Sequence, residues 1–191
     1  MSAERPSAQA VAVGTTLYGA SVPVFEHYLY CLRQTLDVAE NHERRSGKPL
    51  LRAALTEGMF GFAQQVTIAC GFALRACCPL LGIEVPALAG GEQDWPALCE
   101  RIDATLAFLG QLPADAINAG ESLDVQTTAG MATRSFVGRD FVLGYALPNF
   151  FFHLVTAQAI LRNQGVPIGK QDFDGYHEYP AGFSFPVSTG R

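Results

Sequence analysis

The stretch PNFFFHLVTAQAILRNQG, residues 148–165, has the pattern of an apolar helix with a line of polar side chains along one side. Its apolar residues recur at helical spacing, and Gly165 is typical of the residue that ends a helix. Asn149, His153 and Thr156 fall at positions i, i+4 and i+7, so they share one face. Because apolar residues flank this line, we expect it to face other helices rather than bulk water.

Three upstream segments repeat apolar residues at the same spacing: residues 23–46, 51–81 and 94–112. The second is apolar on nearly all sides, which predicts burial on several faces, and a break is expected near Gly58 and Gly61. The third opens at Asp94, whose side chain is of the type that caps a helix N-terminus. The last helix, from about Arg139 to Asn163, contains Pro148, so it either kinks or begins there.

The segments SLDVQT and ATRSFVG, on either side of Ala129 and Gly130, predict a short β-hairpin. The pattern as a whole predicts an all-α protein, a four-helix bundle with a small hairpin before the last long helix. The loops after the second and third helices leave room for a crossover connection. We expect one domain over residues 18–175, preceded by a loose leader at 1–17 and followed by a tail at 176–191.

Composition and charge exclude several classes of function. The 191 residues are 49% hydrophobic, enough for one buried core, and the net charge of −5 argues against nucleic-acid binding. The chain opens without a secretory signal and holds no uninterrupted apolar run of the ~20 residues that span a membrane. Five cysteines, odd in number and without a CxxC pair, predict reduced thiols. We therefore expect a cytoplasmic protein with neither a membrane nor a nucleic-acid partner.

The polar line raises two interpretations of His153. It is either a core histidine whose nitrogens are satisfied by neighbouring groups, or the floor of a polar pocket between helices. Gln64 and Gln65 interrupt the apolar second helix, and His27 lies at the edge of the apolar face of the first helix. Together with Asn149, His153 and Thr156, these three residues are the expected lining of a pocket for an unknown small molecule. No residue pattern identifies a catalytic group.

Three blocks carry a resemblance to a known family: PNFFFHLVTAQAILRNQGVPIGKQDFDG, SVPVFEHYLYCLRQTL and MFGFAQQVTIA. Between about Tyr18 and Gly175 the chain resembles an uncharacterised bacterial family, a domain of unknown function grouped with the DinB/YfiT-like metalloenzymes. The resemblance implies a DinB-type four-helix bundle that often forms a homodimer through helix faces. It implies no particular activity.

Metal-binding members of that superfamily carry in their last helix a His, a second His four residues later, and then Leu-Arg and a Gly. Leu161-Arg162 and Gly165 match this ending, and His153 matches the second His, whereas Asn149 takes the place of the first. The third His would fall near Gln64 or Gln65. The resemblance therefore implies a degenerate metal site, and we expect no cofactor. The alternative is a metal-dependent enzyme of this class, such as a thiol-conjugate transferase, with His153 holding Zn²⁺ or Ni²⁺.

Overall fold

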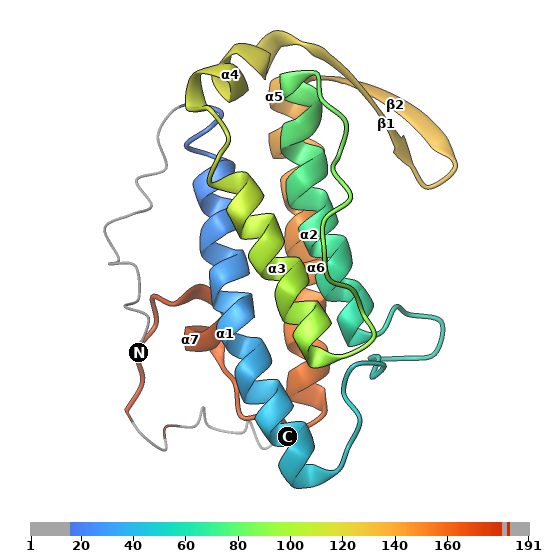
Figure 1. Ribbon diagram of the computed structural model, residues 1–191, viewed down its shortest axis with the longest axis vertical. Coiled ribbons are helices and arrows are strands. Elements are labelled where there is room, and N and C mark those ends of the chain that lie inside the picture. The colour runs from blue at the N-terminus through green and yellow to red at the C-terminus, as the bar shows by residue number, and fades with distance from the viewer. Residues whose placement is uncertain (1–15, 181–182, 184–191) are drawn as a thin grey trace, which may run out of the picture.

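The computed structural model describes residues 16–180 and residue 183, and its core is a bundle of four long helices (Figure 1). These are α1 (Val22–Ser46), α2 (Phe62–Cys77), α3 (Trp95–Leu109) and α6 (Leu147–Asn163). The shorter elements are η1 (Cys78–Leu81), α4 (Ala114–Ala119), η2 (Gly120–Ser122), β1 (Asp124–Ala129), β2 (Ala132–Val137), α5 (Gly138–Asp140), η3 (Phe141–Ala146) and α7 (Lys170–Asp174). The predicted all-α bundle with a hairpin before the last long helix is confirmed.

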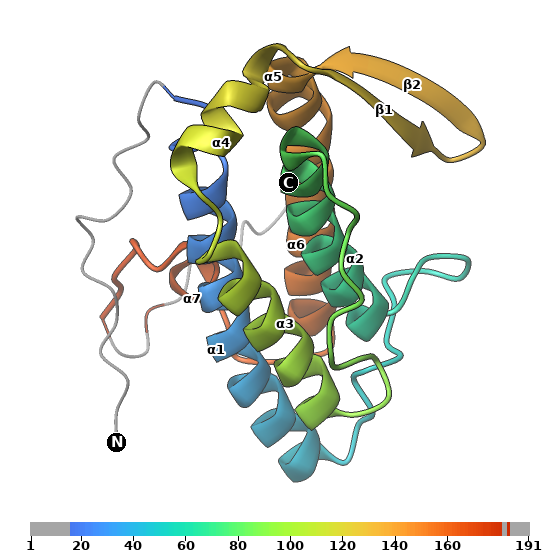
Figure 2. The same cartoon turned by 45° about the horizontal axis from the view of Figure 1, so that its top comes forward.

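The connection between α2 and α3 is a crossover. Residues 82–94 run back along α2 from one end of the bundle to the other, so α2 and α3 run in the same direction (Figures 1 and 2). α1 packs against α3, and α2 packs against α6. The rings of Phe25 on α1 and Phe150 on α6 meet edge to face with centroids 4.9 Å apart, and both are fully buried. The core thus joins all four helices.

Two helix ends follow the sequence signals. α1 stops at Gly47, which adopts φ 70°, a left-handed conformation that glycine reaches without a steric penalty. α3 begins after Asp94, whose Oδ1 accepts the Ala97 backbone N–H at 2.8 Å. This is the predicted N-cap, and it satisfies one of the N–H groups that a helix start leaves without an intrahelical partner.

Residues 51–61 correct the expected start of the second helix. They form turns rather than a helix, and α2 begins only at Phe62. The segment folds back on the helix start: the Phe62 and Ala63 N–H groups donate to the carbonyls of Ala53 and Leu51, at 2.8 and 2.9 Å. It therefore caps α2, because it supplies acceptors for backbone donors that a helix start leaves unpaired.

The last long α-helix begins next to Pro148, after a shorter helical piece, which is one of the two predicted alternatives. A π-helical turn, η3, runs directly into α6, and Pro148 is the second residue of α6. Proline has no N–H to donate to the preceding turn, and a wider turn before it is a common way to carry a helix past such a defect. The same helix ends as predicted, with Gly165 at φ 85°.

The hairpin stands at one end of the bundle and projects from it (Figure 2). β1 and β2 are antiparallel, with Val125 opposite Phe136, and the turn contains Gly130 at φ 60°. Val125 is buried at the base of the hairpin, whereas Met131 at its tip is fully exposed. The hairpin therefore joins the core only through its base.

The segment Phe62–Leu81, which is α2 together with η1, is long and apolar enough to cross a membrane by length and composition alone. In this fold 61% of its 18-residue apolar window is buried inside the protein. Its apolar sides lie against α1, α3 and α6, so it is a core helix of the bundle.

The two expected terminal segments are described in part. Residues 1–15 of the leader lie outside the described residues, and Leu17 is buried in the core. Of the expected tail, residues 176–180 and 183 are described. Tyr176 stacks on His27 of α1 with ring centroids 4.7 Å apart, so the start of this tail lies against the bundle.

Candidate functional site

The polar line on α6 is satisfied mostly by its own helix. Asn149 Nδ2 donates to the Tyr145 carbonyl at 2.7 Å, and Thr156 Oγ1 donates to the Phe152 carbonyl at 2.6 Å. Such bonds to carbonyls of the preceding turn satisfy these side chains within their own helix. Asn149 is half-buried and Thr156 is buried. Only His153, of these three, makes its side-chain hydrogen bond to another helix.

His153 and Gln65 form a buried pair between α6 and α2. The ring Nδ1 lies 2.7 Å from Gln65 Oε1, and Gln65 Nε2 donates to the Phe60 carbonyl at 3.2 Å. Because Nε2 faces a carbonyl, Oε1 is the atom that faces the ring, and His153 Nδ1–H must be the donor. The pair fixes the ring's tautomer, with the proton on Nδ1 and a lone pair on Nε2.

The surroundings of His153 favour a neutral ring. Burial lowers its pKa below the usual value of 6.5, and the positive charge of Arg75 lowers it further. The ring stacks on Phe72 with centroids 5.5 Å apart, and the Arg75 guanidinium lies 4.1 Å from the centre of the same Phe72 ring. His153 is thus an uncharged, well-packed residue of the α2–α6 contact.

The donor set at this position fits a transition metal poorly. Of the groups that match the superfamily's three imidazoles, Asn149 gives its Nδ2 to a helix carbonyl and Gln65 accepts from His153. His153 Nδ1 already carries a proton, so a single lone pair at Nε2 remains. Zn²⁺ and similar ions need several nitrogen, sulfur or carboxylate ligands. Across residues 16–180 and 183, no three His, Cys, Asp or Glu side chains are grouped to hold a metal ion.

Gln64 lies away from the His153–Gln65 pair. It lines a separate depression at the start of α2, of about 450 Å³, together with Arg52 and Glu92. Consecutive helix residues point about 100° apart, so Gln64 and Gln65 cannot both face α6. The predicted choice between them is resolved in favour of Gln65.

His27 lies on the other side of the bundle, where α1 meets the C-terminal segment, residues 170–179. Its Nε2 is 2.7 Å from the Asp174 carbonyl, and a carbonyl can only accept, so Nε2 carries a proton. The Cys31 thiol is 4.0 Å from the same nitrogen. Since that nitrogen has no lone pair to offer, His27 cannot act there as the base that activates this thiol.

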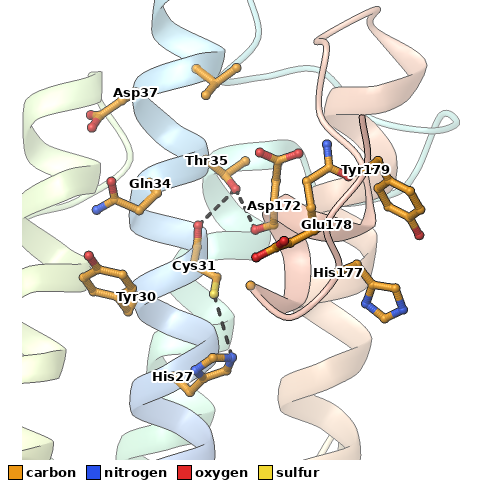
Figure 3. Close-up of a pocket in the computed structure, with 13 residues that line it drawn as sticks. His27, Tyr30, Cys31, Gln34, Thr35, Asp37, Asp172, His177, Glu178 and Tyr179 are labelled. Atoms are coloured by element: carbon orange, nitrogen blue, oxygen red, sulfur yellow. Dashed lines mark hydrogen bonds between the residues drawn. The ribbon is translucent and has the colours of Figure 1, made fainter. Parts of the chain in front are cut away.

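The contact between α1 and the C-terminal segment contains a cavity of about 630 Å³, which is within the usual range for small-molecule sites. Figure 3 shows the labelled lining side chains along α1 and on the segment that passes beside it. The lining residues are His27, Tyr30, Cys31, Gln34, Thr35, Asp37, Val38, Gln171, Asp172, Gly175, His177, Glu178 and Tyr179. This cavity holds one residue of the predicted pocket, His27.

Hydrogen bonds hold the segment that forms one wall of the cavity. Thr35 Oγ1 lies 3.4 Å from the Asp172 carbonyl, and buried Asp174 accepts the Tyr176 and His177 backbone N–H groups at 3.0 and 3.2 Å. Burial raises the pKa of the Asp174 carboxyl, but these N–H groups and the His177 ring outweigh it, so the pKa lies below its usual value. Asp174 therefore stays ionised and keeps the chain folded at the cavity edge.

The segment also needs Gly175. It adopts φ 68°, and a Cβ there would lie 3.3 Å from Cys31 Sγ, so a larger residue would be both strained and crowded. Residues 176–179, the C-terminal part of this wall, belong to the predicted tail. The available signal was the dense mixture of acidic and aromatic residues in QDFDGYHEY, residues 171–179.

The four helices, with their crossover between α2 and α3, define a DinB-like bundle. The crystal structure of a DinB family member protein from Shewanella denitrificans matches it with a TM-score of 0.72 and 29% sequence identity, covering 86% of this chain and 95% of that chain. The chain belongs to the family described as a domain of unknown function, DUF1993, whose model matches residues 17–174. No curated protein matches the chain.

Proposed function

We propose that this protein binds a small molecule in the cavity between α1 and the C-terminal segment. The observation that carries the proposal is the cavity itself: about 630 Å³ with lining groups that include a thiol, two imidazoles, three carboxylates and two phenols. Sites for small ligands combine such a volume with a few polar groups that fix the ligand's orientation.

The geometry favours this location over the polar line on α6. The side chains of Asn149 and Thr156 bond to their own helix, and His153 is occupied by Gln65 and stacked on Phe72. A ligand at that position would have to displace well-made contacts. At the α1 cavity it would meet exposed side chains such as Gln34, Gln171 and Glu178.

A ligand screen with two matched variants tests the proposal. Gln34→Trp places a large ring in the α1 cavity, and Gln64→Trp places the same ring in the separate depression at the start of α2. We expect small molecules from a metabolite library to raise the melting temperature of the wild type and of Gln64→Trp, but not of Gln34→Trp. Ligands that act on all three proteins alike, or that lose their effect in Gln64→Trp, would place binding elsewhere.

The alternative, a metal-dependent enzyme using His153, requires a bound divalent ion. We propose that the protein purified without a histidine tag holds no stoichiometric transition metal, because Asn149 and Gln65 are poor ligands and one imidazole binds Zn²⁺ or Ni²⁺ weakly. Elemental analysis by mass spectrometry checks this. About one equivalent of metal per chain, lost in His153→Ala but kept in His27→Ala, would reverse the choice.

A further inference from the structure

We propose that the ligand of the α1 cavity is a small organic cation, a molecule with one or more protonated amino or guanidino groups. This inference rests on the proposed function, because it concerns the charge of the molecule that the same cavity receives. It is drawn from the charged side chains that line the cavity and from the groups that those side chains already contact.

Acidic side chains predominate among the charged groups that line the cavity. Asp37, Asp172 and Glu178 line it, and among the described residues no lysine or arginine does. A phosphate or carboxylate ligand would therefore meet three carboxylates and no lysine or arginine of the described lining, whereas a cation would meet complementary charge. The net charge of the whole chain, −5, acts in the same direction at longer range.

The three carboxylates are not equally available. Asp37 Oδ1 is 2.9 Å from Arg33 Nη1 within α1, and Asp172 Oδ2 accepts the Gly169 N–H at 2.7 Å. Each of these contacts uses one carboxylate oxygen, so the second oxygen of Asp37 and of Asp172 can still accept a hydrogen bond from a ligand. Glu178 is exposed at the cavity edge. The main attraction for a cation should therefore come from Glu178, with Asp172 and Asp37 as further acceptors.

The uncharged groups of the lining also suit a nitrogen cation. Gln34 and Gln171 offer amide oxygens, and Tyr30 adds an aromatic ring to the lining. Aromatic faces attract ammonium and guanidinium groups. The His177 Nδ1 lies 2.6 Å from Asp174 Oδ2, so the ring is directed to that buried carboxylate rather than to the three that face the cavity.

A bare divalent metal ion is a worse occupant than an organic cation. Within residues 16–180 and 183, no three His, Cys, Asp or Glu groups are close enough together to hold one, although five such side chains line this cavity besides Cys31. Acceptors spread over a cavity of this size can instead contact an extended molecule at several points. The inference is thus for a ligand with its positive charge on a carbon chain or ring.

Three probes of the same chain length separate charge from shape: putrescine, butanediol and succinate, which are dicationic, neutral and dianionic. Binding to the full-length wild type is followed by nitrogen–proton NMR shifts of residues 27–38 and 170–180. We expect saturable shifts in these residues with putrescine, weaker ones with butanediol and none with succinate. The putrescine shifts should diminish as salt is raised, because screening weakens partly exposed charge pairs.

Glu178→Gln and Glu84→Gln form the matched pair of variants, since both residues are exposed and only Glu178 lines the cavity. We expect Glu178→Gln to weaken putrescine binding about two- to fivefold, the loss typical of one partly exposed ion pair, and Glu84→Gln to leave it unchanged. Equal weakening in both variants would show only general attraction to an acidic surface and would overturn the inference.

The outcomes distinguish a wrong ligand class from a wrong site. Cavity shifts with butanediol or succinate that equal or exceed those with putrescine overturn the cationic ligand but leave a binding cavity in place. Absence of cavity shifts with all three probes also overturns it. The proposed function has its own test: it is contradicted when library compounds raise the melting temperature of Gln34→Trp as much as that of the wild type.

Discussion

His153 differs from its two neighbours on α6 in the distance over which its hydrogen bond acts. Asn149 and Thr156 bond to carbonyls four residues earlier, whereas His153 bonds to Gln65, 88 residues away in the sequence. A bond between two helices stabilises their packing, whereas a bond within one helix does not. The geometry at this residue therefore supports the interpretation of His153 as a satisfied core histidine, and its participation in a ligand pocket stays a prediction.

Replacing His153 by alanine should destabilise the protein by about 2 kcal/mol, because it leaves buried Gln65 Oε1 unpaired and empties the space against Phe72. Thr156→Val is the control, since its hydroxyl bonds only to its own helix, and it should cost less than about 1 kcal/mol. Denaturant unfolding of both variants measures the difference. Equal effects would show that the His153–Gln65 bond has no special role.

The lowered pKa of His153 predicts a pH dependence of stability. The unfolded chain, with an ordinary histidine pKa near 6.5, takes up the proton before the folded chain does, so the free energy of unfolding falls as pH drops below about 6.5. His153→Gln keeps a donor for Gln65 but cannot titrate in this range. Unfolding of both proteins between about pH 7.5 and pH 5 should show a steeper loss for the wild type.

Two carboxyl groups also contribute to the pH dependence of the free energy of unfolding. Comparison with His153→Gln is needed to separate the contribution of His153 from theirs. Burial raises the pKa of the Glu26 carboxyl, so its contribution opposes that of His153 as the pH falls. The pKa of Asp174 is lowered, and its contribution is lost only at still lower pH. Parallel curves for wild type and His153→Gln would contradict a buried neutral imidazole.

At the scale of elements, the C-terminal segment is held to the bundle through α1. His27 provides two of the contacts, the bond to the Asp174 carbonyl and the stacking on Tyr176. Phe173 adds a ring contact with Tyr28, at a centroid distance of 5.2 Å. Thr35 Oγ1 lies 3.4 Å from the Asp172 carbonyl, so several side chains of α1 hold the wall of the cavity.

The change His27→Ala should release this wall without unfolding the bundle. We expect amide hydrogen exchange of residues 171–180 to become roughly tenfold faster, from the loss of one hydrogen bond and one ring stack. Exchange in α2, α3 and α6 should not change. His42→Ala, at a half-buried position near the end of α1, is the matched control. Faster exchange throughout the protein would mean that His27 stabilises the bundle itself rather than the segment.

The whole molecule presents an apolar surface that the fold does not cover. α2 contributes little to this surface, because most of its residues are buried against neighbouring helices of the same chain. Large exposed apolar residues are scattered over several elements, and two of them, Phe152 and Val155, lie three residues apart on α6. An exposed pair of large apolar side chains on a packed helix is a common feature of an association surface. The expected homodimer therefore stays a prediction, with α6 as its contact.

Phe152→Glu should convert a dimer into a monomer, because a charge at the centre of an apolar contact is not paired there. The measurement is light scattering at micromolar concentration, where the wild type should have twice the chain mass of 20.5 kDa. Met131→Glu, at the exposed hairpin tip, is the control and should leave the mass unchanged. A wild-type mass of one chain, or loss of the dimer in Met131→Glu alone, would remove α6 as the contact.

The sequence by itself determined the elements that depend on local pattern. Helical spacing of apolar residues predicted α1, α3 and α6, the capping chemistry of Asp94 predicted the start of α3, and alternating β-prone residues around Gly130 predicted the hairpin. These features follow from backbone geometry over a few residues. The non-helical conformation of residues 51–61 was not predicted in this way. Two carbonyls of this segment accept hydrogen bonds from the start of α2, and the spacing of apolar residues does not reveal such contacts.

Only the tertiary structure decided which side chains meet. It paired His153 with Gln65 rather than Gln64, placed His27 beside Asp174, 147 residues away, and separated these two histidines into different sites. Periodicity tells which face of a helix is buried, but not which helix covers it. The docking of a segment such as residues 170–179, a short helix followed by an irregular stretch, depends on long-range contacts that no local pattern encodes. The cavity arises from that docking, so it appears only in the folded chain.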